Sequence, residues 1–165
     1  MPLFPLALTL LMLIALGYDM HRYLIPNWIS AMVLALYVVF LALSPAHVEW
    51  KWALAAFAGV FVLGYIMFAL KWLGGGDVKL MAVCALWTGI KALPEFLFGM
   101  ALLGGLLSLG LILLRQLLPW VFPAQAANGT LPRLLTKDAP VPYGVAIAAG
   151  FLLVLWRGLL PGIGL

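Results

Sequence analysis

The run from Trp52 to Leu70, WALAAFAGVFVLGYIMFAL, contains no charged residue and is bounded by Lys51 and Lys71. About 20 consecutive apolar residues are enough for a helix to cross the hydrocarbon core of a bilayer. The rest of the chain has the same character: of its 165 residues 67% are hydrophobic and 8% are charged. A soluble domain carries about 25% charged residues. We therefore expect an all-α integral membrane protein.

Charges and clusters of proline and glycine divide the chain into six apolar runs. The runs cover residues 3–18, 26–43, 52–70, 78–93, 96–118 and 141–160. The fourth run is short, and Lys91 and Pro94 mark its end. We expect the uncharged first run to be a retained helix rather than a signal peptide. Six spanning helices use roughly 120 residues. Residues 1–165 are thus expected to form one membrane domain with no soluble domain.

The nine basic residues are scattered and form no stripe that could follow a phosphate backbone, which disfavours a nucleic-acid partner. We interpret them as determinants of topology. If the loops alternate sides, the larger group comprises Arg22, Lys71, Lys79, Arg115, Arg133 and Lys137. The smaller group comprises Lys51, Lys91 and Arg157. The positive-inside rule predicts that the larger group faces the cytoplasm and that both termini lie outside.

Two of the five acidic residues lie at the edges of apolar runs, at the expected cytoplasmic boundary. Asp19 ends the first run, and Asp77 precedes the fourth. An ionisable residue at a bilayer edge is costly, and it is by default a candidate for function. Each also has a structural explanation, Asp77 as a helix N-cap and Asp19 as the partner of Arg22. Together, two carboxylates from different helices can hold a water molecule and share a proton.

Helix polarity suggests how such a pair would divide its roles. Asp19 follows the C-terminal end of the first expected helix, whose partial negative charge favours a protonated acid. Asp77 meets the N-terminal end of the fourth, which favours a carboxylate. Asp77 is accordingly expected to be the base.

Several small or rigid residues flank the two aspartates. The sequence Gly74-Gly75-Gly76 permits backbone conformations that a side chain would forbid and lets a substrate backbone approach, although a flexible loop would also explain it. Pro26 suits the first turn of the second helix, and Gly144, in Pro142-Tyr143-Gly144, allows close helix approach.

The sequence lacks the residues that other classes of hydrolase require. Cys84 is the only cysteine, and His21 and His47 fall in loops on opposite sides, so no metal site and no cofactor are expected. No Gly-x-Ser-x-Gly sequence occurs, and no histidine lies near a serine at a plausible depth, which disfavours a serine hydrolase.

Three ordered motifs resemble the type IV prepilin peptidases, and more closely the short CpaA/TadV-type enzymes of the tight-adherence (Flp) pilus. They are Tyr18-Asp19 with Ile25-Pro26-Asn27-Trp28, then Gly74-Gly75-Gly76-Asp77-Val78-Lys79-Leu80, then Pro142-Tyr143-Gly144-Val145. The resemblance implies that Asp19 and Asp77 are the catalytic pair, the latter in a Gly-x-Gly-Asp motif. It implies that Gly74, Gly75, Gly76 and Lys79 form an active-site loop, and that Pro26, Asn27, Tyr143 and Gly144 support it.

The resemblance also implies a substrate and a location. Such enzymes sit in the bacterial inner membrane among its lipids, as multi-pass proteins. They cut a prepilin that has a basic leader, a glycine and then an apolar helix, at the cytoplasmic face, and they serve the pilus-assembly machinery. Longer members carry a cytosolic insert with paired Cys-x-x-Cys motifs and also N-methylate the new terminus. This chain has Cys84 alone, so zinc is not implied and methylation stays open.

Two other classes remain open on the residues alone. A small transporter could use membrane carboxylates and a glycine break, though no polar file through several helices and no internal repeat is visible. A noncatalytic pilus-assembly membrane protein could share the fold but would tolerate loss of either aspartate.

Overall fold

A computed structural model describes residues 3–43, 49–121, 128, 133–136 and 139–163, and every regular element among them is a helix. The elements are α1 (Leu3–Arg22), α2 (Asn27–Leu43), α3 (Trp50–Ala69), α4 (Gly75–Val121), the 3-10 helix η2 (Arg133–Leu135) and α6 (Tyr143–Trp156). Helices α1, α3 and α4 are long and apolar enough to cross a membrane, and α2 and α6 are shorter apolar helices. The expected all-α membrane architecture is confirmed.

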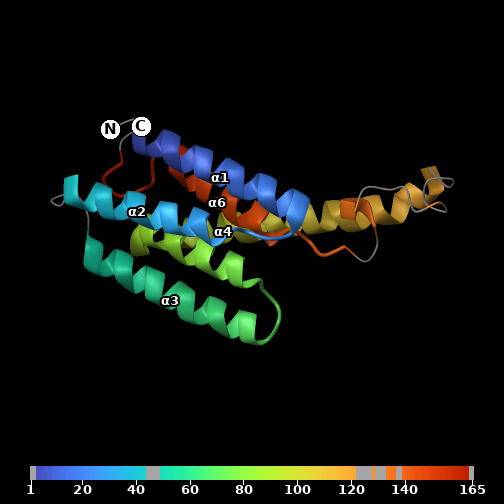
Figure 1. Cartoon of the computed structure of the whole chain (residues 1–165), viewed down its shortest axis with the longest axis horizontal. Coiled ribbons are helices and arrows are strands. Elements are labelled where there is room, and N and C mark those ends of the chain that lie inside the picture. The colour runs from blue at the N-terminus through green and yellow to red at the C-terminus, as the bar shows by residue number, and fades with distance from the viewer. Residues whose placement is uncertain (1–2, 44–48, 122–127, 129–132, 137–138, 164–165) are drawn as a thin grey trace.

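Helix α4 contains the largest difference from the sequence prediction. Gly89 has φ 56° and ψ −175°, a conformation that is essentially restricted to glycine, and it breaks α4 into two helical parts. The chain reverses there, so the light-green part before Gly89 and the yellow part after it run in opposite directions (Figure 1). These parts correspond to the fourth and fifth expected helices. The prediction that the fourth helix ends at Leu93 was wrong, because the break falls at Gly89.

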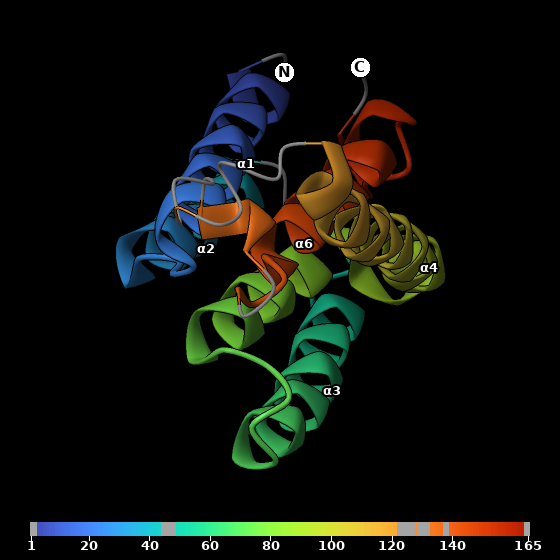
Figure 2. The same cartoon turned by 90° about the vertical axis from the view of Figure 1, so that its right-hand side faces the viewer.

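Small residues bring α4 and α6 into close contact. A Cβ atom on Gly150 would lie 2.7 Å from the backbone nitrogen of Met100, and one on Gly99 would lie 3.8 Å from the Cα of Gly150. Beside them the rings of Phe96 and Phe151 pack edge to face, with centroids 6.2 Å apart. Seen along the bundle, α6 lies between α1 and α4, and α3 lies on the far side of the first part of α4 (Figure 2). The helices thereby pack into a single bundle, whose two ends differ in packing.

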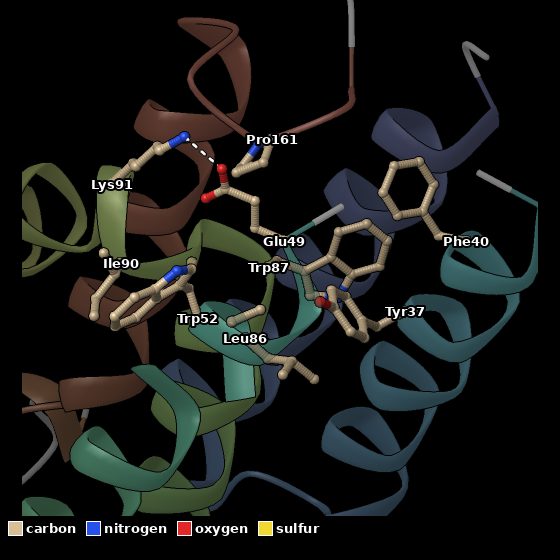
Figure 3. A pocket seen from close by; sticks show the side chains of 11 residues that line it. Tyr37, Phe40, Glu49, Trp52, Leu86, Trp87, Ile90, Lys91 and Pro161 are labelled. Atoms are coloured by element: carbon tan, nitrogen blue, oxygen red, sulfur yellow. Dashed lines mark hydrogen bonds and ion pairs between the residues drawn. The ribbon is translucent and has the colours of Figure 1, made fainter. Parts of the chain in front are cut away.

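One end of the bundle is tightly packed. There Trp87 is 2% exposed and stacks on Phe40, while its indole Nε1 donates a hydrogen bond to the carbonyl of Val33 at 3.1 Å. Figure 3 shows the same region with the ion pair of Lys91 and Glu49, whose Nζ and Oε1 are 2.9 Å apart. The cavity between these side chains measures about 20 Å³. The helix α1 begins at this end, and the chain returns to it after α6 (Figure 1).

The second part of α4 extends past the opposite end of the bundle (Figure 1). At 1.5 Å per residue, the helix from Gly89 to Val121 is about 48 Å long, more than the roughly 30 Å of hydrocarbon that a spanning helix crosses. The sequence prediction ended this helix at Leu118, although Pro119 is accommodated inside it. The projecting turns lie at the end of the bundle where Asp19 and Asp77 are found.

Candidate functional site

Asp19 and Asp77 line one cavity of about 680 Å³, which we call the aspartate cavity. Asp19 lies near the C-terminal end of α1 and is 4% exposed, and Asp77 lies in the first turn of α4 and is half-buried. The two carboxyl groups are close enough to interact electrostatically. The other lining residues come from the ends of α1 and α3 and from the start of α6: Tyr23, Phe68, Ala69, Lys71, Trp72, Leu73, Gly74, Pro140, Val141 and Tyr143.

Asp77 is held by the chain that precedes it. Its Oδ2 accepts the backbone N–H of Gly74 at 3.2 Å, and the N–H of Val78 donates to the carbonyl of Gly74 at 3.1 Å. Gly74 therefore occupies the N-cap position, and Asp77 is the N3 residue whose side chain reaches back to it, as the acid of a capping box does. The expectation that Asp77 is itself the N-cap was wrong. Its Oδ1 is buried and has no hydrogen-bond partner among the described residues.

Asp19 is held by α6. Its Oδ2 accepts the backbone N–H of Val145 at 3.2 Å, and the N–H of Gly144 contributes a further hydrogen bond. Both aspartates consequently meet a helix N-terminus, α6 for Asp19 and α4 for Asp77, so the difference in helix polarity from which we assigned Asp77 as base disappears. Among the described residues, Asp19 forms no ion pair with Arg22, whose guanidinium lies 5.8 Å from the ring centroid of Tyr18.

The glycines around the aspartates leave room for close contacts with the carboxylates and with the backbone of a neighbouring segment. None of Gly74, Gly75 and Gly76 has a positive φ, so left-handed backbone is not the reason for them. A Cβ on Gly74 would lie 2.6 Å from Asp77 Oδ2, and a Cβ on Gly76 would lie 2.9 Å from the carbonyl oxygen of Ile25. Gly144 would bring a Cβ to 2.8 Å from Asp19 Oδ2. At Gly75 the nearest atom is in the Phe68 side chain, at 3.4 Å.

Other predicted site residues lie outside the aspartate cavity. Lys79 donates from Nζ to Asn27 Oδ1 at 2.9 Å, which joins the start of α4 to the start of α2. Pro26 precedes α2, and its carbonyl accepts the N–H of Ile29 at 3.1 Å. Of the predicted set, Asp19, Gly74, Asp77 and Tyr143 line the cavity. His47, Lys137 and Asp138 lie outside the described residues, as does the side chain of Arg133.

Two cavity residues that the sequence reading missed have unusual backbones. Tyr23 has φ 52° and Lys71 has φ 63°, in the left-handed region that side chains rarely adopt. Tyr23 follows α1, and Lys71 lies where α3 ends, with the N–H of Trp72 donating to the carbonyl of Met67 at 2.9 Å. Glycine or asparagine usually fills such positions, so the sequence carried no local signal for these turns.

Arg115 fixes another wall of the cavity. It is 8% exposed, and its Nε and Nη2 donate to the carbonyl of Leu134 at 3.1 and 2.9 Å. Nη2 also donates to the carbonyl of Pro140 at 3.3 Å, and Pro140 lines the cavity. The sequence reading treated Arg115 only as a topology determinant. Its partners are backbone groups distant in sequence, which no local motif reveals.

The arrangement suits acid–base chemistry on a water molecule. Two carboxyl groups from separate helices face one open cavity, and one oxygen of Asp77 has no partner in the part of the chain that the structure describes. Among the described residues no three of His, Cys, Asp and Glu are grouped as metal ligands would be. Carboxyl groups in such a position can accept and donate protons in turn.

The chain matches the sequence model of the type IV leader peptidase family over residues 6–109, a segment that includes both aspartates. It belongs to the type IV leader peptidase family. The prepilin leader peptidase/N-methyltransferase of Bacillus subtilis is 31% identical over 158 residues, 94% of this chain and 56% of that protein. The enzyme of the same name from Aeromonas hydrophila is 30% identical over 152 residues, 87% of this chain and 46% of that protein.

The chain thus spans about half the length of these curated leader peptidase relatives. No solved structure matches the chain significantly. The resemblance to type IV prepilin peptidases is confirmed at the level of the family. Membership, together with the apolar helices, identifies the chain as an integral membrane protein.

Proposed function

We propose that the chain is a membrane-embedded aspartic endopeptidase that removes the leader of a type IV prepilin, with Asp19 and Asp77 activating the water. The observation that carries the proposal is the meeting of these two carboxyl groups in one open cavity at the end of the bundle. The names of the curated relatives support the substrate class. The short tight-adherence subtype and a Flp-like prepilin are the finer form of the proposal, and they follow from the motifs.

The proposed reaction uses one aspartate as base and the other as acid. The base takes a proton from water while the acid donates a proton to the carbonyl oxygen of the scissile peptide, and the water oxygen bonds to the carbonyl carbon. The tetrahedral intermediate then collapses: its C–N bond breaks, the amine nitrogen takes the proton held by the base, and a hydroxyl proton returns to the other aspartate. Both carboxyl groups end in their starting states. Either aspartate can begin as the base, because each meets a helix N-terminus.

The proposed orientation places the aspartate end of the bundle in the cytoplasm of a multi-pass inner-membrane protein. On this side lie the end of α1, with Arg22, the start of α4, with Lys79, and the aspartate cavity, which Lys71 lines. At the other end lie the start of α3, with Lys51, the end of α6, before Arg157, and the small cavity that Lys91 lines. A basic leader would then be cut off on the cytoplasmic side, at a peptide bond just N-terminal to the apolar helix. Cysteine labelling from outside, in a Cys84→Ala background, should modify a cysteine at position 51 and spare one at position 133. The reverse pattern would contradict the orientation.

The test of the reaction is processing of a prepilin by the variants Asp19→Asn and Asp77→Asn. We expect both to insert normally and to leave the precursor uncut, as followed by gel mobility. Normal processing by either variant would refute the catalytic pair and favour a noncatalytic assembly protein that tolerates loss of an aspartate. A chain that transports a solute instead would show uptake that depends on the aspartates with no effect on the precursor.

A further inference from the structure

A second cavity adjoins the aspartate cavity and is almost entirely apolar. It measures about 520 Å³ and lies between the end of α3, both parts of α4 and the start of α6. Trp72, Leu73 and Tyr143 line both cavities, so the two lie side by side. We call the second cavity the apolar groove. It begins beside the aspartate cavity and is lined by residues of α3, α4 and α6.

Small residues on the second part of α4 form one wall of the groove, so few side-chain atoms project from it. Ala101, Gly104, Gly105 and Ser108 all line it, and their spacing places them on one helix face. A Cβ on Gly105 would meet nothing within 4 Å, whereas one on Gly104 would lie 3.0 Å from the Cβ of Ala146. Small residues of this kind let a second helix approach closely within a membrane. The wall at Gly105 is therefore open to an incoming helix.

Flexible apolar side chains also line the groove. Met67 on α3, Met81 on the first part of α4 and Met100 on the second part all border the groove. Methionine fills irregular gaps and repacks around different partners. A groove with a flat glycine wall and methionine walls can accept helices of differing sequence, provided that they are apolar.

We propose that the apolar groove binds the first turns of the substrate's apolar helix, immediately after the scissile bond. This inference rests on the proposed function. The lining that the groove and the aspartate cavity share carries it, because a chain whose peptide bond lies at the two carboxyl groups must continue past one side of that cavity. On the side lined by Trp72, Leu73 and Tyr143, the neighbouring space is a groove of the same apolar chemistry as the segment that follows.

The variant Gly105→Leu tests the groove, with Gly110→Leu as its matched control. A Cβ at either position meets nothing within 4 Å, and Gly110 lies on the same helix outside the groove, so both substitutions should fold. We expect Gly105→Leu to lower kcat/KM for a full-length precursor roughly tenfold to hundredfold, the range for a misfit in an apolar pocket. Cleavage of a short peptide that spans the scissile bond but lacks the helix should be unchanged in both variants.

Two results would overturn the groove as the helix site. One is equal precursor cleavage by Gly105→Leu and Gly110→Leu, which would indicate that lipid alone fills the groove. The other is a parallel loss with the short peptide, which would indicate a disturbed catalytic site.

Crosslinking keeps this inference separate from the proposed function. In a Cys84→Ala background, a cysteine at position 105 should form a disulfide with a cysteine placed in the first turns of the precursor's apolar helix, and a cysteine at position 110 should not. If the unaltered chain cleaves no precursor, the proposed function fails, and crosslinking still decides whether the helix binds here. Absence of the crosslink at position 105 would refute the groove proposal.

Discussion

The two ends of the helical bundle differ in how they are closed. At one end Trp87, Phe40 and the ion pair of Glu49 with Lys91 leave a cavity of about 20 Å³ (Figure 3). At the other end, the ends of α1 and α3 and the starts of α4 and α6 leave about 680 Å³ around Asp19 and Asp77. The two ends also differ in which residues have a positive φ. At the closed end the residue is Gly89, for which a positive φ is easy, whereas at the open end Tyr23 and Lys71 adopt it despite their side chains.

This contrast separates residues that hold the bundle together from residues that hold a site open. Glu49 is a carboxylate with a cation 2.9 Å away, and the exposed side chains of that pair contribute little to stability. Asp19 and Asp77 have backbone N–H groups as partners in place of cations. Asp77, which is held by an amide and has one oxygen without a partner among the described residues, is especially suited to exchange protons.

The largest expected effect tests carboxylates at the two ends. Asp19→Asn and Asp77→Asn should each lower cleavage of a short substrate peptide on the order of 10³-fold, because each removes a proton-transfer group. Glu49→Gln should change it less than twofold. Single-turnover cleavage in detergent would measure all three. Because each aspartate meets a helix N-terminus, we expect losses of similar size, and a much smaller loss for Asp19→Asn would restore Asp77 as the dedicated base.

The next effect distinguishes neighbouring glycines. Gly76→Ala forces its Cβ against the carbonyl of Ile25, 2.9 Å away, and should displace the start of α4 that carries Asp77. A misplacement of about 1 Å can cost 10²-fold in rate, and we expect a loss of about that size. Gly75→Ala, with its nearest contact at 3.4 Å in a side chain, is the control and should retain activity. Equal activity of both variants would indicate that the three glycines serve only as a flexible loop.

A smaller effect is expected from Arg115, which acts through the backbone of Leu134 and Pro140. Arg115→Met should lower kcat about tenfold by loosening the cavity wall, while KM for a short peptide changes little. Arg115→Lys should recover part of the loss, because it keeps one donor. Arg157→Met, at the closed end, is the matched control. Loss of thermal stability without any change in kcat would show that Arg115 is structural only.

The smallest effect on activity is expected at the turn of the closed end. Gly89→Ala has room, since the nearest atom to a Cβ is in Pro161 at 3.8 Å, but it must adopt a backbone conformation that costs about 1–3 kcal/mol. Thermal unfolding in detergent should shift downward, and cleavage at low temperature should be unchanged. A loss of cleavage without loss of stability would mean that the two ends are coupled.

The sequence predicted the helices well, because an apolar run long enough to cross a bilayer is a strong and local signal. It misplaced the break in α4, because the positive φ of Gly89 accompanies a reversal of the chain that no local sequence pattern predicts. It found Asp19 and Asp77 because charges are rare in such a chain. It missed Lys71, Arg115 and Pro140, which become neighbours of the site only when distant segments pack together.

The hydrogen bond from Val145 to Asp19 joins residues 126 positions apart. A chain is synthesised from its N-terminus, so Asp19 emerges early, whereas its backbone donors emerge only with α6. Until α6 inserts, Asp19 lacks these donors and the cavity lacks the wall formed by Val141 and Tyr143. A partly made chain therefore carries both aspartates without a finished site, and proteolytic competence arises only after the bundle is assembled.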